Sequence, residues 1–511
     1  MPEFERVLIA NRGEIAVRVI RTLKALGISS VAIFSDADTD SVHVSMADRA
    51  YRLPGVYPSE TYLNAGKILE VARISDCDAI HPGYGFLSER SEFSKLCREN
   101  SVKFIGPSPE TLALSGNKLE CKKLVESLGV PVIPYSKEPL NTAREAAEFA
   151  SSLGYPVLLK SAFGGGGRGI KEARSTAEVK EAFESSQREA MSSFGRFSVF
   201  VEKKILNPRH IEVQILGSPQ DMIHLGEREC SIQRRYQKLV EISPSPIIDE
   251  SSRARVTDYA KRAAGAVGYS NAGTVEFLRD GESGELYFIE INSRLQVEHP
   301  VTEMVTGIDL VNSQIQVAAS GRLPLRQEDV HFSGCAIECR INAEDSLAGF
   351  APATGQVRFL HIPGGPGVRV DSALRVGAEV TPYYDSLVAK LICWGQTFDQ
   401  ARRRAVVALD EFTIAGFENT IPFHRVVLSD ASFALGRLGT NFIDQRNILQ
   451  TLSAKTKEEE LTTRENYTLA ALLISLKNNE GSGHRRADRR KDNPARPRVF
   501  YKREGRFADA L

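Results

Sequence analysis

The 511-residue sequence lacks the features that mark membrane-spanning and exported proteins. No apolar run approaches the roughly 18 residues that a membrane span needs. The chain passes from Met1 almost directly into the apolar run that begins at Arg6, without the basic start and long apolar centre of a signal peptide. We therefore expect a cytoplasmic protein with no membrane partner.

Cysteine is scarce, and its spacing excludes two common kinds of small domain. The count is odd, and no C-x-x-C occurs. Cys335 and Cys339 lie in a predicted strand, where four residues separate them by about 13 Å, too far to share a metal. We therefore expect neither a disulfide framework nor a zinc ribbon. All seven are interpreted as free thiols: Cys77, Cys97, Cys121, Cys230, Cys335, Cys339 and Cys393.

An excess of charge of one sign is also absent. The formal net charge is zero, which gives no overall attraction to nucleic acid or to an anionic membrane. The stretch from Arg485 to Arg506 is strongly basic, but it has few aromatic residues that could stack on bases. A nucleic-acid partner is therefore not expected.

The elements that are present indicate an α/β protein. The N-terminal part predicts a strand over Arg6–Asn11, a helix over Glu14–Leu26 that stops at Gly27, and a strand over Ser30–Ser35. Alternation of this kind predicts a parallel sheet. No G-x-G-x-x-G follows the first strand, so we do not predict NAD binding.

The positions of glycine, proline and charged residues indicate the domain boundaries in the rest of the chain. A helix is predicted from Gly116 to Leu128, ending at Gly129. A small α/β unit with a glycine run follows, and then come strand-like segments. We predict an N-terminal parallel α/β domain (1–115), a central domain (116–330) that contains a lid (131–203), a C-terminal α+β domain (331–450) and a charged tail (451–511).

A run of alternating polar residues is the strongest local signal of a site. On an extended chain every second side chain shares one face. A strand with a solvated polar face is the simpler alternative, but Ile289 and Ile291 on its other side are typical of a strand that packs on a core. Five ion-binding side chains are then predicted on one side: Glu290, Asn292, Arg294, Gln296 and Glu298.

A predicted hairpin sharpens this interpretation. Glu276 and Glu290 are equidistant from Ser283 in the turn, so a symmetric hairpin places the two carboxylates directly opposite each other. Like charges so placed are destabilising, and a divalent cation removes the repulsion. Glu276, Glu290 and Asn292 offer hard oxygen ligands that suit Mg²⁺ or Mn²⁺ held together with phosphate oxygens.

Three further features could hold phosphates or another anion. Consecutive glycines let backbone N–H groups wrap a phosphate, although they could also form a flexible link. The run contains Gly164, Gly165, Gly166 and Gly167, with Lys160 just before it, and is predicted to be a mobile lid. Lys118 near a helix start could add charge there. The basic run around Arg234, Arg235 and Lys238 is a solvated face or an anion site.

Together these motifs resemble the biotin carboxylases of the ATP-grasp superfamily. The similarity runs from Ile9 to about Asp444, nearly the whole chain apart from the tail. The most specific stretches are EINSRLQVEHPVTE and QRRYQK, while the glycine run alone is a weak signal. Others are IANRGEIAVRVIR, HPGYGFLSE, FIGPSPE, KSAFGGGGRGI, FVEKKILNPRHIEVQ, GTVEFL, IECRINAED and YYDSLVAKLI.

The resemblance implies ATP, magnesium (or manganese) and biotin as ligands, and it implies roles for individual residues. It places Lys118, Lys160 and the glycine run on the ATP phosphates, and Glu202 and Lys203 at the adenine, with His210, Gln233 and Lys238 nearby. It implies that Glu276, Glu290 and Asn292 bind magnesium. It assigns bicarbonate to Arg294, Gln296, Lys238 and the Val297 backbone.

The implied reaction fits these residue types. Glu298 acts as general base on bicarbonate beside Arg294. Attack on the γ-phosphorus of ATP gives carboxyphosphate, which yields carbon dioxide and phosphate. The phosphate deprotonates biotin, and Arg340 stabilises the resulting anion. Two positions depart from the family pattern: Tyr236 replaces a usual histidine near the ribose, and Asn117 replaces a frequent aspartate.

The sequence also leaves two other functions open and indicates which partner proteins are needed. Another bicarbonate-using ATP-grasp ligase, such as a carbamoyl-phosphate synthetase half, is the second enzyme reading, and a nucleotide-sensing scaffold is a non-enzymatic one. None of the five methionines precedes a lysine, so we expect the biotin carrier protein and the carboxyltransferase to act in trans. A homodimer is expected, and the apolar patch Leu469–Leu476 could dock a partner. The acyl acceptor stays open among acetyl-CoA, propionyl-CoA and pyruvate.

Overall fold

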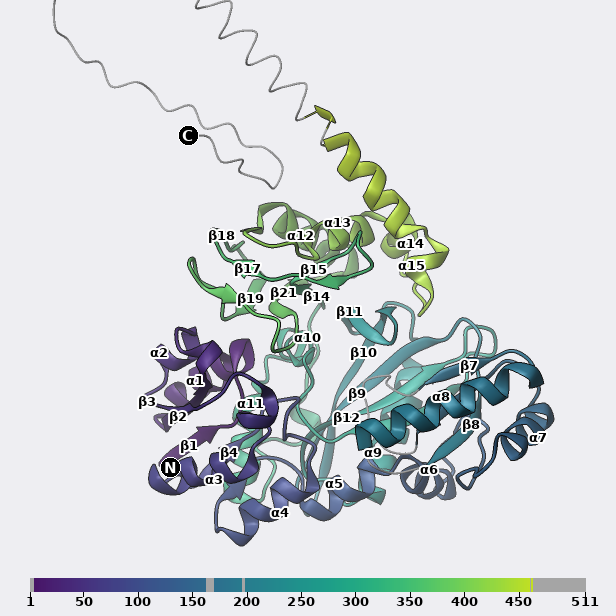
Figure 1. The fold of residues 1–511 in the computed structure, drawn as a ribbon, viewed down its shortest axis with the longest axis horizontal. Helices are drawn as coiled ribbons and strands as arrows, with labels where there is room; N and C mark the ends of the chain where they lie inside the picture. Colours follow the sequence, from purple (N-terminus) through teal and green to yellow (C-terminus); the bar gives the residue numbers. More distant parts are fainter. Residues whose placement is uncertain (1–3, 162–169, 195–197, 460, 463–511) are drawn as a thin grey trace, which may run out of the picture.

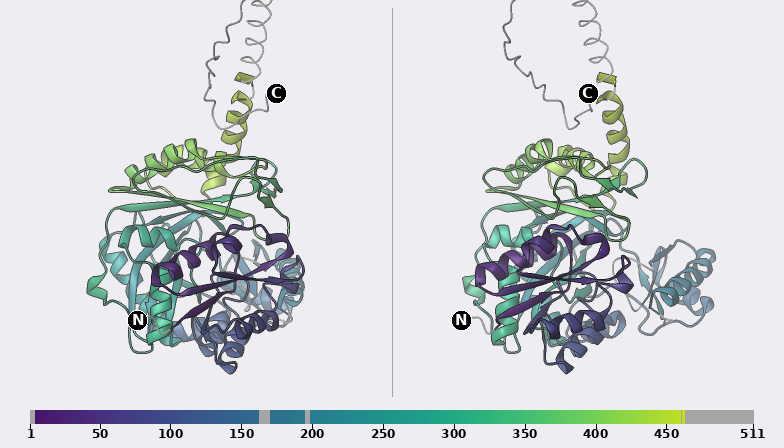
Figure 2. Two further views of the ribbon diagram at one scale, coloured as in Figure 1. Left: turned by 90° about the vertical axis from the view of Figure 1, so that its left-hand side faces the viewer. Right: turned by 60° about the vertical axis from the view of Figure 1, so that its left-hand side comes forward.

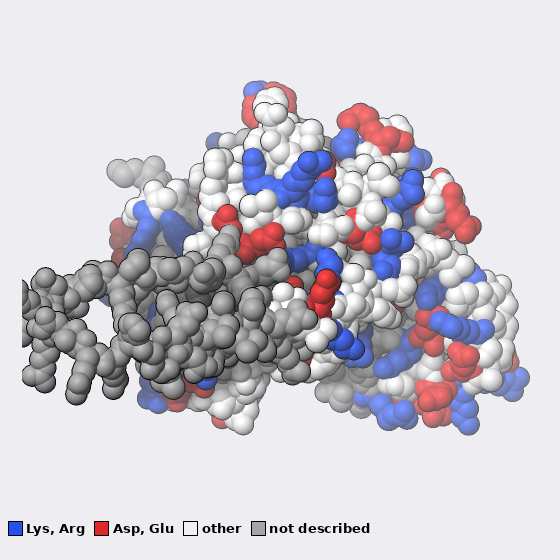
Figure 3. Space-filling view, turned by 90° about the horizontal axis from the view of Figure 1, so that it is seen from above, with Lys and Arg blue, Asp and Glu red and all other residues white. Residues whose placement is uncertain are grey.

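The structure is a computed structural model, and it describes residues 4–161, 170–194, 198–459 and 461–462. Two predictions fall outside these residues: the glycine run 164–167 as a phosphate lid, and the docking patch 469–476 in the tail. The described residues contain no helix that is both long and apolar enough to cross a membrane. Basic and acidic side chains are intermixed on the face shown in Figure 3.

A five-stranded parallel sheet opens the chain, as the alternating pattern predicted (Figure 1). Its order is β3-β2-β1-β4-β5. Helix α1 (Gly13–Leu26) follows β1 and ends at Gly27, whose φ of 71° lies in the left-handed region that glycine tolerates best. The strands are β1 (Arg6–Ile9), β2 (Ser29–Ser35), β3 (Arg49–Leu53), β4 (Ala79–His81) and β5 (Lys103–Phe104).

A second sheet of eight antiparallel strands carries most of the candidate site. Its order is β13-β12-β9-β10-β11-β14-β21-β19. It therefore joins strands from both sides of position 330, and it brings the C-terminal β14 beside the central β11. The bounds are β9 (Arg209–Gly217), β10 (Met222–Arg234), β11 (Gln237–Ser243), β12 (Asn271–Arg279), β13 (Leu286–Asn292), β14 (Cys335–Asn342), β19 (Val368–Ser372) and β21 (Leu387–Gly395).

The small unit predicted as a lid has a sheet and a core of its own. Strands β6 (Val157–Ser161), β7 (Lys171–Ala173) and β8 (Val199–Lys203) form its sheet. Helices α7 (Ala143–Leu153) and α8 (Thr176–Phe194) pack against this sheet. Figure 2 shows the unit standing to one side of the rest of the chain, which suits an element that closes over a ligand.

The single helix predicted from Gly116 to Leu128 is wrong at its start. Helix α5 (Pro109–Gly116) ends there, and α6 (Lys118–Ser127) begins two residues later. The side chain of Asn117 accepts a hydrogen bond from the backbone N–H of Glu120, which is the usual contact of an N-cap. Lys118 is consequently the first residue of α6, as the phosphate-site hypothesis requires.

Candidate functional site

One row of charged residues crosses four neighbouring strands of the large sheet. Arg228 of β10 is the register partner of Glu212 of β9, and Glu212 is the partner of Glu276 of β12. Glu276 in turn lies opposite Glu290 of β13, which confirms the predicted opposition of the two carboxylates, although the hairpin is not symmetric, since a register shift after Glu276 pairs Phe277 with Phe288. Register partners share a face, so three carboxylates lie side by side and require cations between them.

Lys238 of β11 supplies one of those cations. Its ammonium donates to Glu276 and Glu298 at 2.7 and 2.8 Å, and it also pairs with Glu212. Burial alone would lower the pKa of Lys238, but the three carboxylates outweigh burial and raise that pKa well above its usual value. The lysine predicted for bicarbonate is therefore a fixed positive charge at the centre of the site.

The predicted metal ligands lie together, although lysines partner them. Lys118 at the start of α6 is 2.7 Å from Glu290, and Lys238 forms an ion pair with Glu276. Asn292 ends β13, and its side-chain oxygen is 3.5 Å from a guanidinium nitrogen of Arg294. Carboxylate and amide oxygens on two paired strands fit a Mg²⁺ ion, since this ion prefers oxygen ligands together with phosphates.

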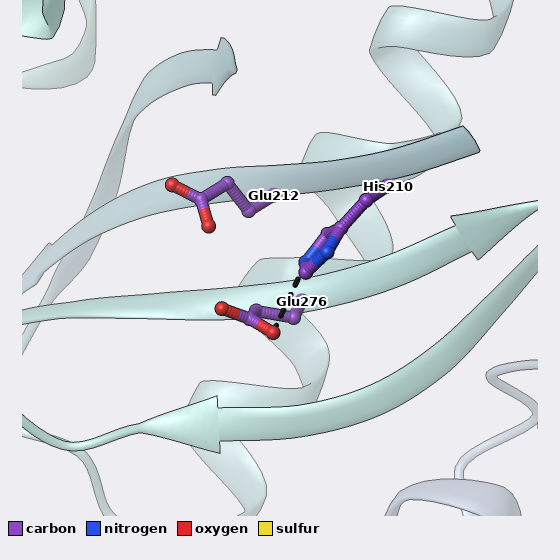
Figure 4. A group of neighbouring side chains, drawn as sticks. All are labelled: His210, Glu212 and Glu276. Carbon is purple, nitrogen blue, oxygen red and sulfur yellow. Dashed lines mark ion pairs between the residues drawn. The ribbon is translucent and has the colours of Figure 1, made fainter. Parts of the chain in front are cut away.

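A second set of ligand atoms includes a histidine (Figure 4). His210, Glu212 and Glu276 each offer one atom, and these atoms lie within 4.8 Å of one another. His210 Nε2 is 3.0 Å from Glu276, while its Nδ1 is 2.6 Å from the side-chain nitrogen of Gln233. His210 and Gln233, both predicted at the nucleotide, thus contact each other, and His210 also contacts the charged row.

Glu212 and Arg228 were not identified in the sequence as site residues. The alternation of His210, Glu212 and Gln214 along β9 was a usable signal, because these side chains share one face of the strand. Arg228 is fully buried and donates to Glu212, Gln214 and Thr302 at 2.5–2.9 Å. Its role depends on strand pairing that local patterns do not reveal.

The prediction of one extended face from Glu290 to Glu298 is wrong beyond Asn292. Strand β13 ends at Asn292, and α10 (His299–Thr306) begins after Glu298, with a proline in its first two positions. A short loop over 293–298 links them. Ser293 of this loop is fixed by the Ser115 hydroxyl at 2.5 Å and by Glu89 at 3.2 Å. These tertiary contacts override the extended pattern.

The loop still brings the predicted bicarbonate residues together. Arg294 donates to the side-chain oxygen of Gln296 at 2.7 Å and to Glu89 at 3.0 Å. The Gln296 amide nitrogen lies 3.5 Å from Glu276. The Gln296 amide and Lys238 therefore both lie beside the carboxylate of Glu276, and Lys238 also contacts that of Glu298.

Glu298 is held between two cations. Lys238 donates to one carboxylate oxygen at 2.8 Å, and Arg340 of β14 donates to the other at 2.9 Å. Burial alone would raise the pKa of Glu298, but Lys238, Arg340 and Arg228 outweigh burial and lower it well below its usual value. The carboxylate is therefore ionised at neutral pH and can accept a proton, while Arg340 is also anchored to Glu241 at 2.6 Å.

The residues predicted at the lid and adenine form a separate buried cluster. Glu202 is fully buried and pairs with both Lys160 and Lys122. Burial would raise the pKa of Glu202, yet the two lysines lower it to about 2. Lys122 was missed, although it lies one turn after Lys118 on the same face of α6. Lys203 donates to the backbone carbonyls of Gly154 and Tyr155 at 2.8 and 3.2 Å.

The β10–β11 turn presents Tyr236 at the protein surface. Arg235 and Tyr236 have φ angles of 49° and 65°, so two residues with side chains occupy the left-handed region. Tyr236 is 49% exposed. Its neighbours in the basic run diverge: Lys238 enters the site, whereas Arg234 donates to the carbonyl of Gly349 at 2.7 Å. The run is therefore neither a wholly solvated face nor one anion cluster.

Three family descriptions match the chain in succession. Residues 3–112 match "Biotin carboxylase, N-terminal domain", and residues 338–445 match "Biotin carboxylase C-terminal domain". Residues 117–326 match "Carbamoyl-phosphate synthase L chain, ATP binding domain". The alternative ligase reading thus has a counterpart in the central part, whereas the flanking parts match biotin carboxylases.

Individual relatives agree with this assignment. Biotin carboxylase 1 of Bacillus subtilis is 48% identical over 446 residues, which cover 87% of this chain and 99% of the relative. The 2-oxoglutarate carboxylase small subunit of Hydrogenobacter thermophilus is 48% identical over 86% of this chain and 93% of its own length.

Solved structures are similar over the same range. The biotin carboxylase domain dimer of the Hydrogenobacter thermophilus 2-oxoglutarate carboxylase, in complex with MgADP and bicarbonate, has a TM-score of 0.85 at 48% identity, covering 87% of this chain and 98% of that one. Biotin carboxylase from Campylobacter jejuni, in complex with a β-γ-ATP ligand, has a TM-score of 0.84 at 43% identity, covering 86% and 99%.

Proposed function

The chain belongs to the biotin carboxylase family and carboxylates biotin with ATP and bicarbonate, and on this premise we propose that Glu298 is the general base. The observation that carries this role is the position of Glu298 between Lys238 and Arg340. An ionised carboxylate can take the proton of bicarbonate, and the negative charge that bicarbonate gains then takes over the pairing with nearby cations such as Lys238.

The remaining roles follow from the neighbours of Glu298. Bicarbonate is held by Arg294, Gln296, Lys238 and the Val297 backbone, and loses its proton to Glu298. Its oxygen attacks the γ-phosphorus of ATP, ADP leaves, and carboxyphosphate forms. Carboxyphosphate then gives carbon dioxide and phosphate, and the phosphate removes the proton from biotin N1. Arg340 faces the resulting biotin anion, whose nitrogen attacks carbon dioxide.

The nucleotide lies between the lid and the large sheet. Lys118, Lys160 and the glycine run 164–167 bind the phosphates, and Glu202 and Lys203 bind the adenine, with His210, Gln233 and Tyr236 toward the ribose. For this, Lys160 leaves Glu202 when phosphate oxygens become available. Glu276, Glu290 and Asn292 would hold magnesium, which would neutralise phosphate charge when bound.

We further propose how the chain is organised and assembled. Its parts are 1–115, 116–330, 331–450 and 451–511, with the lid at 131–203. For the 2-oxoglutarate carboxylase of Hydrogenobacter thermophilus, one relative is named as the small subunit and the biotin carboxylase domain was crystallised as a dimer, which supports a homodimer working with a biotin carrier and a carboxyltransferase in trans. All seven cysteines are buried thiols, which suits a reducing compartment such as the cytoplasm.

The proposed roles are tested on the purified chain with free biotin. We expect bicarbonate-dependent ATP cleavage that biotin stimulates, and no biotinylated band on a streptavidin blot after expression with biotin ligase. A biotinylated band at the mass of this chain contradicts a carrier in trans. The carboxyltransferase that co-purifies identifies the acyl acceptor.

A further inference from the structure

A fully buried lysine contacts the loop formed by residues 293–298. Lys390 of β21 has no exposed surface. It is the register partner of Arg340 on β14, so both cations lie on the same face of the sheet, side by side. Arg340 contacts the carboxylate of Glu298, whereas Lys390 takes a different partner.

That partner is the backbone just before the proposed general base. The Lys390 ammonium donates to the carbonyl oxygen of Val297 at 3.0 Å. This carbonyl belongs to the peptide group that joins Val297 to Glu298. Glu298 is therefore held from two sides, through its carboxylate by Arg340 and through its preceding peptide by Lys390.

The other contacts of Lys390 tie this peptide to the N-terminal part. Glu14 of α1 lies 3.1 Å from the ammonium, and Asp371 of β19 lies 3.9 Å away. Glu14 also accepts a hydrogen bond from the hydroxyl of Tyr84. One buried ammonium thus connects α1, β19, β21 and the loop that precedes α10.

Stability does not explain why a charge is kept there. Moving a lysine and a carboxylate out of water costs free energy that their attraction often fails to recover, and neutral side chains of similar volume can replace such pairs at little cost. A directed N–H donor, by contrast, can fix a peptide that no regular element holds. Residues 293–298 lie outside helices and strands, so their backbone depends on contacts of this kind.

We propose that Lys390 is a positioning residue that orients the Val297–Glu298 peptide for bicarbonate activation, with Glu14 as its counter-charge. This inference rests on the proposed function of Glu298 and the Val297 backbone. Lys390 itself touches no substrate. Its loss displaces the proposed base and the adjoining Val297 backbone together, and small displacements of reacting groups cost large factors in rate.

The test compares Glu14→Gln with the double variant Lys390→Met/Glu14→Gln. Glu14→Gln keeps the donor to Val297 and an oxygen that can accept from Tyr84, and Asp371 still lies 3.9 Å from the Lys390 ammonium, so the kinetics should stay within about twofold of wild type. The double variant removes both charges and the donor; kcat/KM for bicarbonate should fall about tenfold or more, with the KM for ATP within about twofold. Lys95→Met/Glu99→Gln, an exposed pair on α4 (Ser91–Glu99), is the matched control.

Two results would overturn the proposed role of Lys390. Wild-type bicarbonate kinetics in the double variant overturn the inference, as does an equal loss in Glu14→Gln alone, because the donor to Val297 is then irrelevant. If the double variant does not fold, Lys390→Gln replaces it, since its amide ends short of the Nζ position, and the same selective loss is required. Wild-type protein without bicarbonate-dependent ATP cleavage would instead overturn the proposed function.

Discussion

Glu276 and Glu290 lie opposite each other on paired strands, yet each carboxylate is neutralised by a different lysine. Lys238 from β11 contacts Glu276, and Lys118 from the first position of α6 contacts Glu290. A magnesium ion held by these carboxylates, as we propose, would compete with the two ammonium groups for the same oxygens.

This arrangement predicts a selective effect of Glu290→Gln on metal dependence. The variant keeps the shape of the side chain but loses one anionic ligand, so the magnesium concentration for half-maximal activity should rise about tenfold or more. Titration of ATP cleavage with magnesium measures it. Glu282→Gln, in the exposed turn of the same hairpin, is the control and should leave the titration unchanged. An unchanged titration in Glu290→Gln means that Glu290 is not a ligand.

Glu298→Gln tests the proposed base. Removing the proton acceptor while keeping a similar shape should lower bicarbonate-dependent ATP cleavage by about 100-fold or more, with the KM for ATP little changed. Because the pKa of Glu298 is held well below its usual value, the carboxylate stays ionised across the neutral range. Any loss of wild-type activity between about pH 8 and about pH 6 must then come from another group. Near-normal turnover in Glu298→Gln excludes it as the base.

The sequence predicted the local parts of this site better than its long-range parts. The parallel N-terminal sheet followed from strand–helix alternation, and the opposition of Glu276 and Glu290 followed from a symmetric turn. Both depend on residues close in the chain. Lys390 was missed because its partners arrive through pairing of strands far apart in sequence. Such pairings are not encoded in any local period.

The extended run from Glu290 to Glu298 shows how tertiary contacts override a period-2 pattern. The alternation is real, but Ser115 and Glu89 capture Ser293, and a proline-containing helix starts after Glu298. Pro300 was a signal in the sequence for that helix start. The polar side chains still converge, by way of a loop and not along a strand.

Glu202 couples the stability of the lid to pH. Its pKa is about 2 in the folded protein, against a usual value of 4.5, because Lys122 and Lys160 outweigh the effect of burial. A lowered folded-state pKa means that the carboxylate stabilises the fold above the unfolded-state pKa, and that this stabilisation is lost as the pH falls from 4.5 towards 2. The pH range in which Glu202 stops stabilising the lid is therefore acidic.

Glu202→Gln should lower the free energy of unfolding of the lid by about 3 kcal/mol at neutral pH, since it leaves two lysines without their carboxylate. The difference from wild type should shrink as the pH falls through this range. Hydrogen exchange of β6 and β8 amides at several pH values measures both effects. Glu138→Gln, an exposed partner of Lys123, is the control and should change nothing measurable. A pH-independent difference contradicts the role of the Glu202 charge.

Tyr236 offers a test that separates backbone strain from nucleotide binding. Arg235 and Tyr236 both adopt positive φ, which residues with a Cβ occupy at a cost of about 1–2 kcal/mol each. Tyr236→Gly relieves this cost, although glycine also gains entropy in the unfolded chain, so the melting temperature should stay equal or rise slightly. The same variant loses the ring proposed to lie near the ribose, and the KM for ATP should rise about threefold or more.

Tyr236→His completes the comparison, because it keeps a ring with a hydrogen-bonding edge at the same turn. Its KM for ATP should stay within about twofold of wild type, while the positive φ strain remains. Melting curves and ATP titrations on the three proteins then separate the two contributions. If Tyr236→Gly leaves the KM for ATP unchanged, Tyr236 serves the turn alone, and its proposed contact with the nucleotide is wrong.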